Sequence, residues 1–159
     1  MTQAAALARA DIARLIPQQG AMCLLAHVDA WDENMIVCRA DNHRDSAHPL
    51  RSRSGLLSSC LIEYAAQAMA VHGALRTPTR PGASQPGFLA AARNVELCRH
   101  RLDDLPPATP DELRIEAHRQ AGDARQLLYA FSAFHGGSLL ASGRISVVLA
   151  PAQQSSGAA

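Results

Sequence analysis

The stretch SGLLSSCLIEYAAQAMAVHGAL, residues 54–75, decides the fold of this chain. From Leu56 to Arg76 the strongest helix formers dominate, and the prolines and glycine at positions 78, 81 and 82 end the pattern. The run predicts one long helix that starts near Gly55. Because this helix carries few charges, we expect apolar cover around most of its circumference.

Short apolar runs typical of strands flank the helix on both sides. Before it, residues 22–32 and 35–43 predict a hairpin, and a short first helix that ends at Pro17 precedes them. After it, four runs cover residues 88–100, 112–122, 126–137 and 139–150, with glycine-containing turns between the last three. We expect a meander of antiparallel strands. A sheet that curls around one central helix gives the α+β class and the layout of the hotdog fold.

Length and composition predict one soluble domain. The chain has 159 residues, of which 48% are hydrophobic and 18% charged, and its formal net charge is +1. Such a body is neither disordered nor broadly attractive to nucleic acid. We expect a single domain over residues 1–150, a surface loop over residues 77–87 and a disordered tail over residues 151–159.

The cysteines and the N-terminus predict a cytoplasmic protein. The four cysteines, at positions 23, 38, 60 and 98, are widely spaced in apolar segments and read as reduced core thiols. The first residues lack the apolar core and cleavage site of an export signal. A glutamate near the middle of the long helix, with Gln67 and His72, argues against a membrane span.

Two polar residues interrupt the apolar helix. Glu63 and Gln67 lie one turn apart, so they share one face with Cys60. If that face lines a pocket, partial desolvation would raise the pKa of Glu63 and make it a general acid. The alternative is a solvent-exposed glutamate on an amphipathic helix, and the spacing alone leaves both readings open.

The helix resembles the central-helix motif of hotdog 3-hydroxyacyl-acyl-carrier-protein dehydratases. That motif has a glycine, an apolar pair, an acidic residue and a glutamine one turn later, which correspond here to Gly55, Leu61, Ile62, Glu63, Ala66 and Gln67. The flanks at Ile16-Pro17, at residues 22–32 and at Phe88 are similar to the same family. The stretch HRD…PLR…IEYAAQAMAVHGAL is most similar to the predicted dehydratases of aryl-polyene pigment synthesis.

The resemblance implies a dehydratase that converts a 3-hydroxyacyl thioester into a trans-2-enoyl thioester. A loop histidine removes the α-proton, and Glu63 protonates the departing hydroxyl. The Gly55 region donates an N–H to the thioester carbonyl, and Gln67 orients the acid. The family needs no cofactor. It implies an acyl-carrier-protein-bound or coenzyme A-bound substrate and a homodimer whose sheets join edge to edge, each site taking residues from both chains.

The loop before the helix departs from the common family form, because GHFPGHPxxPG is absent and the glycine lies further from the glutamate. His48 is nearer the usual place by its distance from Glu63. His43, in the HRD triplet, is preferred by likeness to the aryl-polyene branch. Both histidines stay candidates for the base, with His43 favoured.

Other functions remain as alternatives. The same scaffold supports an acyl-thioesterase, in which the helix carboxylate directs water at the thioester, and a non-catalytic acyl-binding or partner subunit. We expect no metal site, because the sequence shows no tight ligand spacing. His72 is expected to be a core or dimer-contact histidine. The loop arginines at positions 44, 51 and 53 could meet an acidic carrier, although a solvated basic loop is the alternative.

Overall fold

The computed structural model describes residues 6–77 and 87–150 of the chain. The expected loop over residues 77–87 therefore lies largely outside the described residues, and the expected tail over residues 151–159 lies wholly outside them. The elements follow in the order β1 (Leu7–Ala8), α1 (Arg9–Leu15), η1 (Gly20–Met22), β2 (His27–Trp31), β3 (Met35–Ala40), η2 (Ser58–Cys60), α2 (Leu61–Arg76), β4 (Gly87–Leu97), β5 (Leu113–Gly122), β6 (Gln126–His135) and β7 (Ser138–Leu149).

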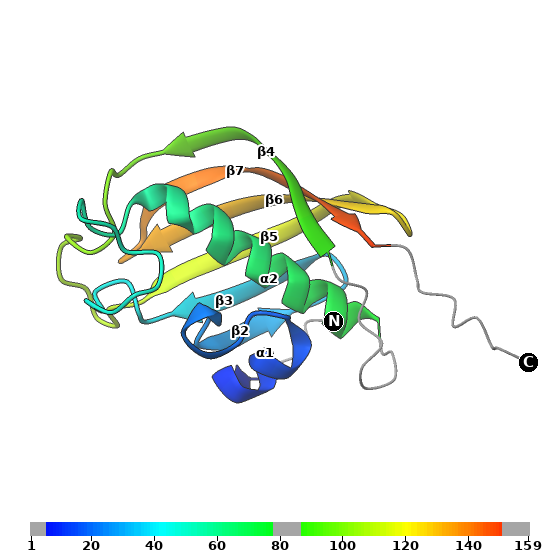
Figure 1. The fold of residues 1–159 in the computed structure, drawn as a ribbon. Helices are drawn as coiled ribbons and strands as arrows, with labels where there is room; N and C mark the ends of the chain where they lie inside the picture. The colour runs from blue at the N-terminus through cyan, green and yellow to red at the C-terminus, as the bar shows by residue number, and fades with distance from the viewer. Residues whose placement is uncertain (1–5, 78–86, 151–159) are drawn as a thin grey trace, which may run out of the picture.

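The strands of the described residues form one antiparallel seven-stranded sheet in the order β1-β2-β3-β5-β6-β7-β4, and α2 lies across one of its faces (Figure 1). The hotdog prediction is confirmed. One detail differs: β4 pairs with β7 at the far edge, whereas β5 pairs with β3. The reason is that α2 crosses the sheet and carries the chain to the opposite edge before β5 returns to the middle.

Helix α2 is buried on several sides, as its low charge predicts. Its buried apolar residues pack against strands β3, β5, β6 and β7, and these residues are Leu61, Tyr64, Ala65, Ala68, Met69 and Val71. The predicted start near Gly55 is wrong, because α2 begins at Leu61 after the short η2 turn. The backbone before it pairs elsewhere: the Leu56 carbonyl accepts from the Leu102 N–H, and the Ser58 N–H donates to the His100 carbonyl.

Gly55 makes a tight turn that only glycine fits. Its φ is +94°, and a Cβ there would lie 2.6 Å from the guanidinium of Arg101, which Asp103 holds at 2.6 Å. We therefore expect Gly55→Ala to lower the free energy of unfolding by about 1–3 kcal/mol. Gly73, in α2 with open space around it, is the matched control, and Gly73→Ala should raise stability by about 0.5–1 kcal/mol. Urea denaturation of both variants measures this, and equal effects would contradict it.

His72 is a core histidine, which is one of the two roles, core or dimer contact, that the sequence predicted for it. It is 0% exposed, its Nε2 donates to the Asp32 carbonyl at 2.7 Å, and its Nδ1 accepts from the Tyr129 hydroxyl at 2.6 Å. Burial lowers its pKa below the ordinary 6.5. The unfolded chain therefore binds a proton at a higher pH than the folded chain does.

Stability should consequently fall as the pH drops below about 6.5 and be fully present above that value. Urea denaturation at about pH 7.5 and about pH 5.5 measures the difference. His72→Gln, which can still donate to Asp32, should reduce this difference, whereas His100→Gln at an exposed position should leave it as in the wild type. An undiminished difference in His72→Gln would contradict the assignment.

The cysteines only partly match the expected core thiols. All four are free, but only Cys23 and Cys38 are buried, while Cys60 is half-buried and Cys98 is exposed. Cys98 is exposed because it follows the edge strand β4. No helix in residues 6–77 or 87–150 has the length and apolar character to cross a membrane. The expected cytoplasmic location stays a prediction.

Candidate active site

Gln67 holds Glu63 against the N-terminal segment. The fully buried amide of Gln67 accepts the Leu24 N–H at 2.9 Å and donates to the Met22 carbonyl at 2.7 Å. Its Nε2 also donates to Glu63 Oε1 at 3.0 Å. Glu63 is half-buried, so it does not stand in open water. This is the geometry that an acid oriented by a glutamine requires.

Both ring nitrogens of His48 are engaged by the scaffold. Nδ1 accepts the Leu50 N–H at 3.1 Å, so Nε2 carries the proton and donates to the Tyr64 hydroxyl at 2.8 Å. That hydroxyl donates in turn to Asn42 at 2.6 Å. Burial lowers the pKa of His48. This chain of hydrogen bonds ties the loop to α2, and the preference for His43 as the base stays a prediction.

His43 belongs to a cluster centred on Asp111. It is 1% exposed, and its Nε2 lies 3.2 Å from Asp111 Oδ1. His135, at the end of β6, places its own Nε2 2.7 Å from the same oxygen. The two imidazoles meet edge to face, with ring centroids 5.4 Å apart. Burial lowers the pKa of His43, and the Asp111 carboxylate opposes that shift.

Arg44 fixes the carboxylate from the other side. Its Nε donates to Asp111 Oδ2 at 2.6 Å and its Nη2 to Oδ1 at 3.1 Å, while Nη2 also donates to the Leu105 carbonyl at 2.9 Å. Hydrogen bonds from Arg44 and then His135 hold the pKa of Asp111 well below its usual range. Arg51 is similarly used in the fold, against Asp103 at 3.1 Å. Two of the three loop arginines therefore bind their own chain.

Donor atoms of His43, Asp111 and His135 lie within 4.8 Å of one another, which by residue type could hold a transition metal. Two observations favour a hydrogen-bonded cluster. The guanidinium of Arg44 already contacts both carboxylate oxygens. Within residues 6–77 and 87–150, His43 Nδ1 has no acceptor of the kind that orients a metal-bound imidazole. The predicted absence of a metal site remains a prediction.

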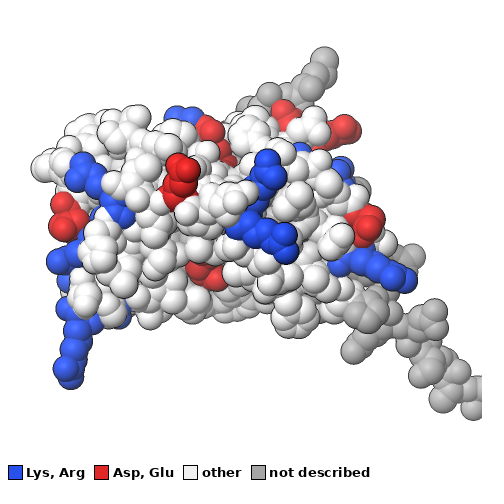
Figure 2. Space-filling view, turned by 90° about the horizontal axis from the view of Figure 1, so that it is seen from above, with Lys and Arg blue, Asp and Glu red and all other residues white. Residues whose placement is uncertain are grey.

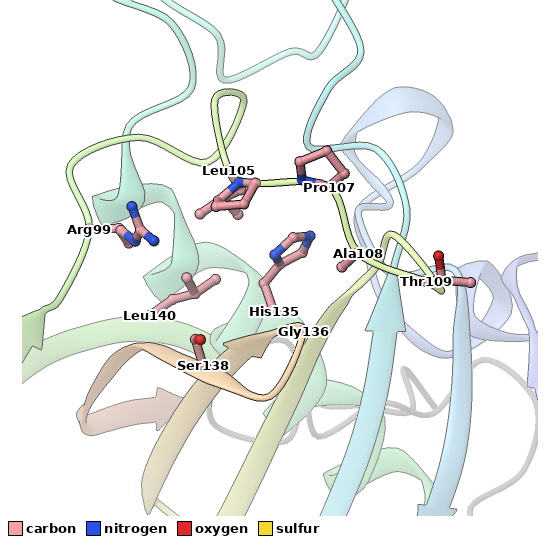
Figure 3. Close-up of a pocket in the computed structure, with 10 residues that line it drawn as sticks. Arg99, Leu105, Pro107, Ala108, Thr109, His135, Gly136, Ser138 and Leu140 are labelled. Atoms are coloured by element: carbon pink, nitrogen blue, oxygen red, sulfur yellow. The ribbon is translucent and has the colours of Figure 1, made fainter.

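A cavity of about 360 Å³ opens beside this cluster. Figure 3 shows His135 in its middle, with Arg99 and Leu140 on one side, Leu105 and Pro107 above it, and Ala108 and Thr109 on the other side. The wall combines polar and apolar groups, and Ser138 closes the β6–β7 side. Asp111 is exposed, whereas both histidines are buried, and His135 connects this cluster with a space that a small ligand could enter.

The predicted site residues fall into separate groups. Glu63 and Gln67 are joined, and His43 lies with Asp111, but no hydrogen bond or ion pair among the described residues links Glu63 to a histidine. The Gly55 N–H donates to the Ser52 carbonyl at 3.1 Å and is therefore already used within the loop in this conformation. Its expected hydrogen bond to the thioester carbonyl of a substrate remains a prediction.

Asp111 and His135 were missed by the sequence reasoning. Asp111 lies 68 residues after His43, and His135 lies a further 24 residues along the chain, so no local spacing joins them. A weak signal existed, because His135 occupies an inward position in the alternating pattern of β6.

Comparison with known proteins decides the family. The model of the ApeP-like family, described as ApeP dehydratase, matches residues 10–157. The chain belongs to the ApeP-like dehydratase family. It is a hotdog dehydratase, a hydro-lyase, as its helix motif predicts. A comparison with curated protein sequences gives no match for this family member.

Solved structures share the fold of this ApeP-like dehydratase. The dehydratase heterocomplex ApeI:P from Xenorhabdus doucetiae matches with a TM-score of 0.75 and 22% identity over 87% of this chain and 90% of that chain. A thioesterase from Haemophilus influenzae matches with a TM-score of 0.63 and 9% identity over 96% and 97%. A hypothetical thioesterase with coenzyme A from Streptococcus pneumoniae matches with a TM-score of 0.53 and 9% identity over 80% and 87%.

Proposed function

We propose that this dehydratase eliminates water from a 3-hydroxyacyl thioester with His43 as base and Glu63 as acid. His43 takes the proton on C2, and the electrons of that C–H bond form the C2–C3 double bond. The C3–O bond breaks, and the hydroxyl leaves as water with the proton from Glu63. The observation that carries the proposal is the Gln67–Glu63 hydrogen bond within a family-type motif.

The substrate is proposed to be an acyl chain on an acyl carrier protein or coenzyme A. Two structural relatives support this class: one is the dehydratase heterocomplex ApeI:P, and another is a hypothetical thioesterase solved with coenzyme A. Arg44 binds Asp111 and Arg51 binds Asp103, so neither is free to contact a carrier protein. Arg53 is the remaining arginine of that loop for such a contact. The carrier-docking role of this loop stays a proposal.

We further propose that a second copy of this chain pairs along β4. This edge strand is exposed over most of its length, and its apolar Phe88 and Leu97 are 64% and 46% exposed. Much of the face seen from above is uncharged, although arginines and acidic side chains interrupt it at several places, some of them next to one another (Figure 2). An open apolar strand edge favours pairing with another chain. Such a dimer could bring His43 of one copy towards Glu63 of the other.

Light scattering of the purified protein measures the mass in solution. A homodimer that Phe88→Glu converts to monomer supports the β4 interface. A monomeric wild-type protein contradicts the β4 interface. A complex that forms only with a second, related hotdog chain also contradicts the homodimer and indicates a heterocomplex like that of the Xenorhabdus relative.

Incubation with a 3-hydroxyacyl thioester tests the reaction. Formation of the enoyl thioester, seen by its absorbance and by loss of the mass of water, supports dehydration. Release of free thiol without an enoyl product points to the thioesterase alternative instead. Binding without turnover points to an acyl-binding subunit.

A further inference from the structure

Asp111 collects three donor residues from two different parts of the chain. His43 comes from the loop after β3, Arg44 from the next position, and His135 from the end of β6. We propose that Asp111 is a positioning residue of this dehydratase, which holds His43 with its proton on Nε2 and so makes Nδ1 the atom that accepts the substrate proton. The inference rests on the proposed function and adds a residue that the family motif does not contain.

The hydrogen-bond pattern sets the tautomer. An ionised carboxylate only accepts hydrogen bonds, so an imidazole nitrogen 3.2 Å from Asp111 Oδ1 must be the protonated one. His43 therefore carries its hydrogen on Nε2 when neutral, and its lone pair lies on Nδ1. The same reasoning places the hydrogen of His135 on Nε2, 2.7 Å from that oxygen.

His43 Nδ1 is buried and has no hydrogen-bond partner among the described residues. A buried polar atom without a partner is rare and costs free energy, so it indicates that a ligand or water completes the site. The lone pair of Nδ1 needs a proton donor. A substrate proton satisfies this need during the reaction, and the resulting imidazolium is then stabilised by the negative charge of Asp111.

The carboxylate itself cannot rotate freely. Arg44 contacts both of its oxygens, and Arg44 is in turn held by the Leu105 carbonyl. His135 binds Oδ1 from the side of the cavity. Because these contacts come from separate segments, the direction of the His43 ring is set by the tertiary fold and not by its own loop alone.

Nitrogen-15 spectra of histidine-labelled protein test the tautomer directly. We expect His43, assigned by its loss in His43→Gln, to show a protonated Nε2 and an unprotonated Nδ1 at neutral pH. In Asp111→Asn this preference should weaken. The opposite tautomer in the wild-type protein would overturn the proposal, and this readout needs no turnover.

Kinetics of the full-length protein provide the second test. Asp111→Asn should lower kcat by about 10²–10⁴-fold with KM changed only a few-fold, because a misplaced proton disables the base without removing substrate contacts. Asp104→Asn, an exposed aspartate in the neighbouring loop, is the matched control and should keep wild-type kcat. A folded Asp111→Asn variant with wild-type kcat overturns the proposal.

If Asp111→Asn does not fold, Arg44→Lys tests the same point. Lysine keeps the positive charge but cannot hold both oxygens, so kcat should fall by about 10-fold to 100-fold. Unchanged kcat in this variant overturns the proposal. If the wild type lacks dehydratase activity altogether, the proposed function fails, whereas the tautomer spectrum still decides whether Asp111 positions His43.

Discussion

Glu63→Gln is expected to abolish most of the dehydratase activity while leaving the fold intact. The glutamine is isosteric and its amide oxygen can still accept the hydrogen bond that Gln67 Nε2 now donates to Glu63. It cannot supply a proton to the departing hydroxyl. Loss of a general acid lowers the rate by about 10²–10⁴-fold, and we expect kcat to fall within that range.

The measurement is the rate of enoyl-thioester formation, with urea denaturation as a check on folding. Glu33→Gln, at an exposed position in the turn between β2 and β3, is the matched control and should retain both activity and stability. Wild-type activity in Glu63→Gln would falsify the acid role and favour the acyl-binding alternative. Loss of thiol release in place of loss of enoyl formation would favour the thioesterase alternative.

Gln67→Leu should show the largest effect on stability. Leucine fills the space of Gln67 but leaves the Leu24 N–H and the Met22 carbonyl without the partners they have now. Each unsatisfied buried group costs about 1–3 kcal/mol, so we expect a loss of about 2–6 kcal/mol for the two together. Activity should fall as well, because Glu63 loses the amide that orients it.

Chemical denaturation measures this loss, and Gln120→Leu, at an exposed position of β5, is the control for the same exchange. The control should change stability by no more than about 0.5 kcal/mol. If both variants are equally stable, Gln67 does not connect the N-terminal segment to α2 as the hydrogen bonds indicate.

Local patterns predicted the elements because the forces that form them act between near neighbours. Strong helix formers ended by prolines predicted α2, and alternating apolar runs bounded by glycines predicted β5, β6 and β7 within a few residues. The start of α2 was missed because Leu56 and Ser58 bond to the segment at His100–Leu102, which is distant in sequence.

Whether the sequence could predict the contacts of a site residue depends on how far apart the contacting residues lie along the chain. Glu63 and Gln67 are four residues apart, so helical geometry alone placed them together. His43, Asp111 and His135 come from separate segments, and only the pairing of β3 with β5 and of β5 with β6 brings them to one end of the sheet. The sequence kept His48 as a second candidate base behind His43, and the structure pairs both nitrogens of His48 with its own chain.

The amino-acid sequence by itself determined the hotdog fold, the long apolar helix and the acid–amide pair on it, because each follows from residue preferences and from the 3.6-residue period of the helix. Only the tertiary structure decided that β4 takes the far edge and that Asp111 receives His43, Arg44 and His135. Contacts between distant segments depend on how the whole sheet curls around α2, and no local pattern in the chain encodes that geometry.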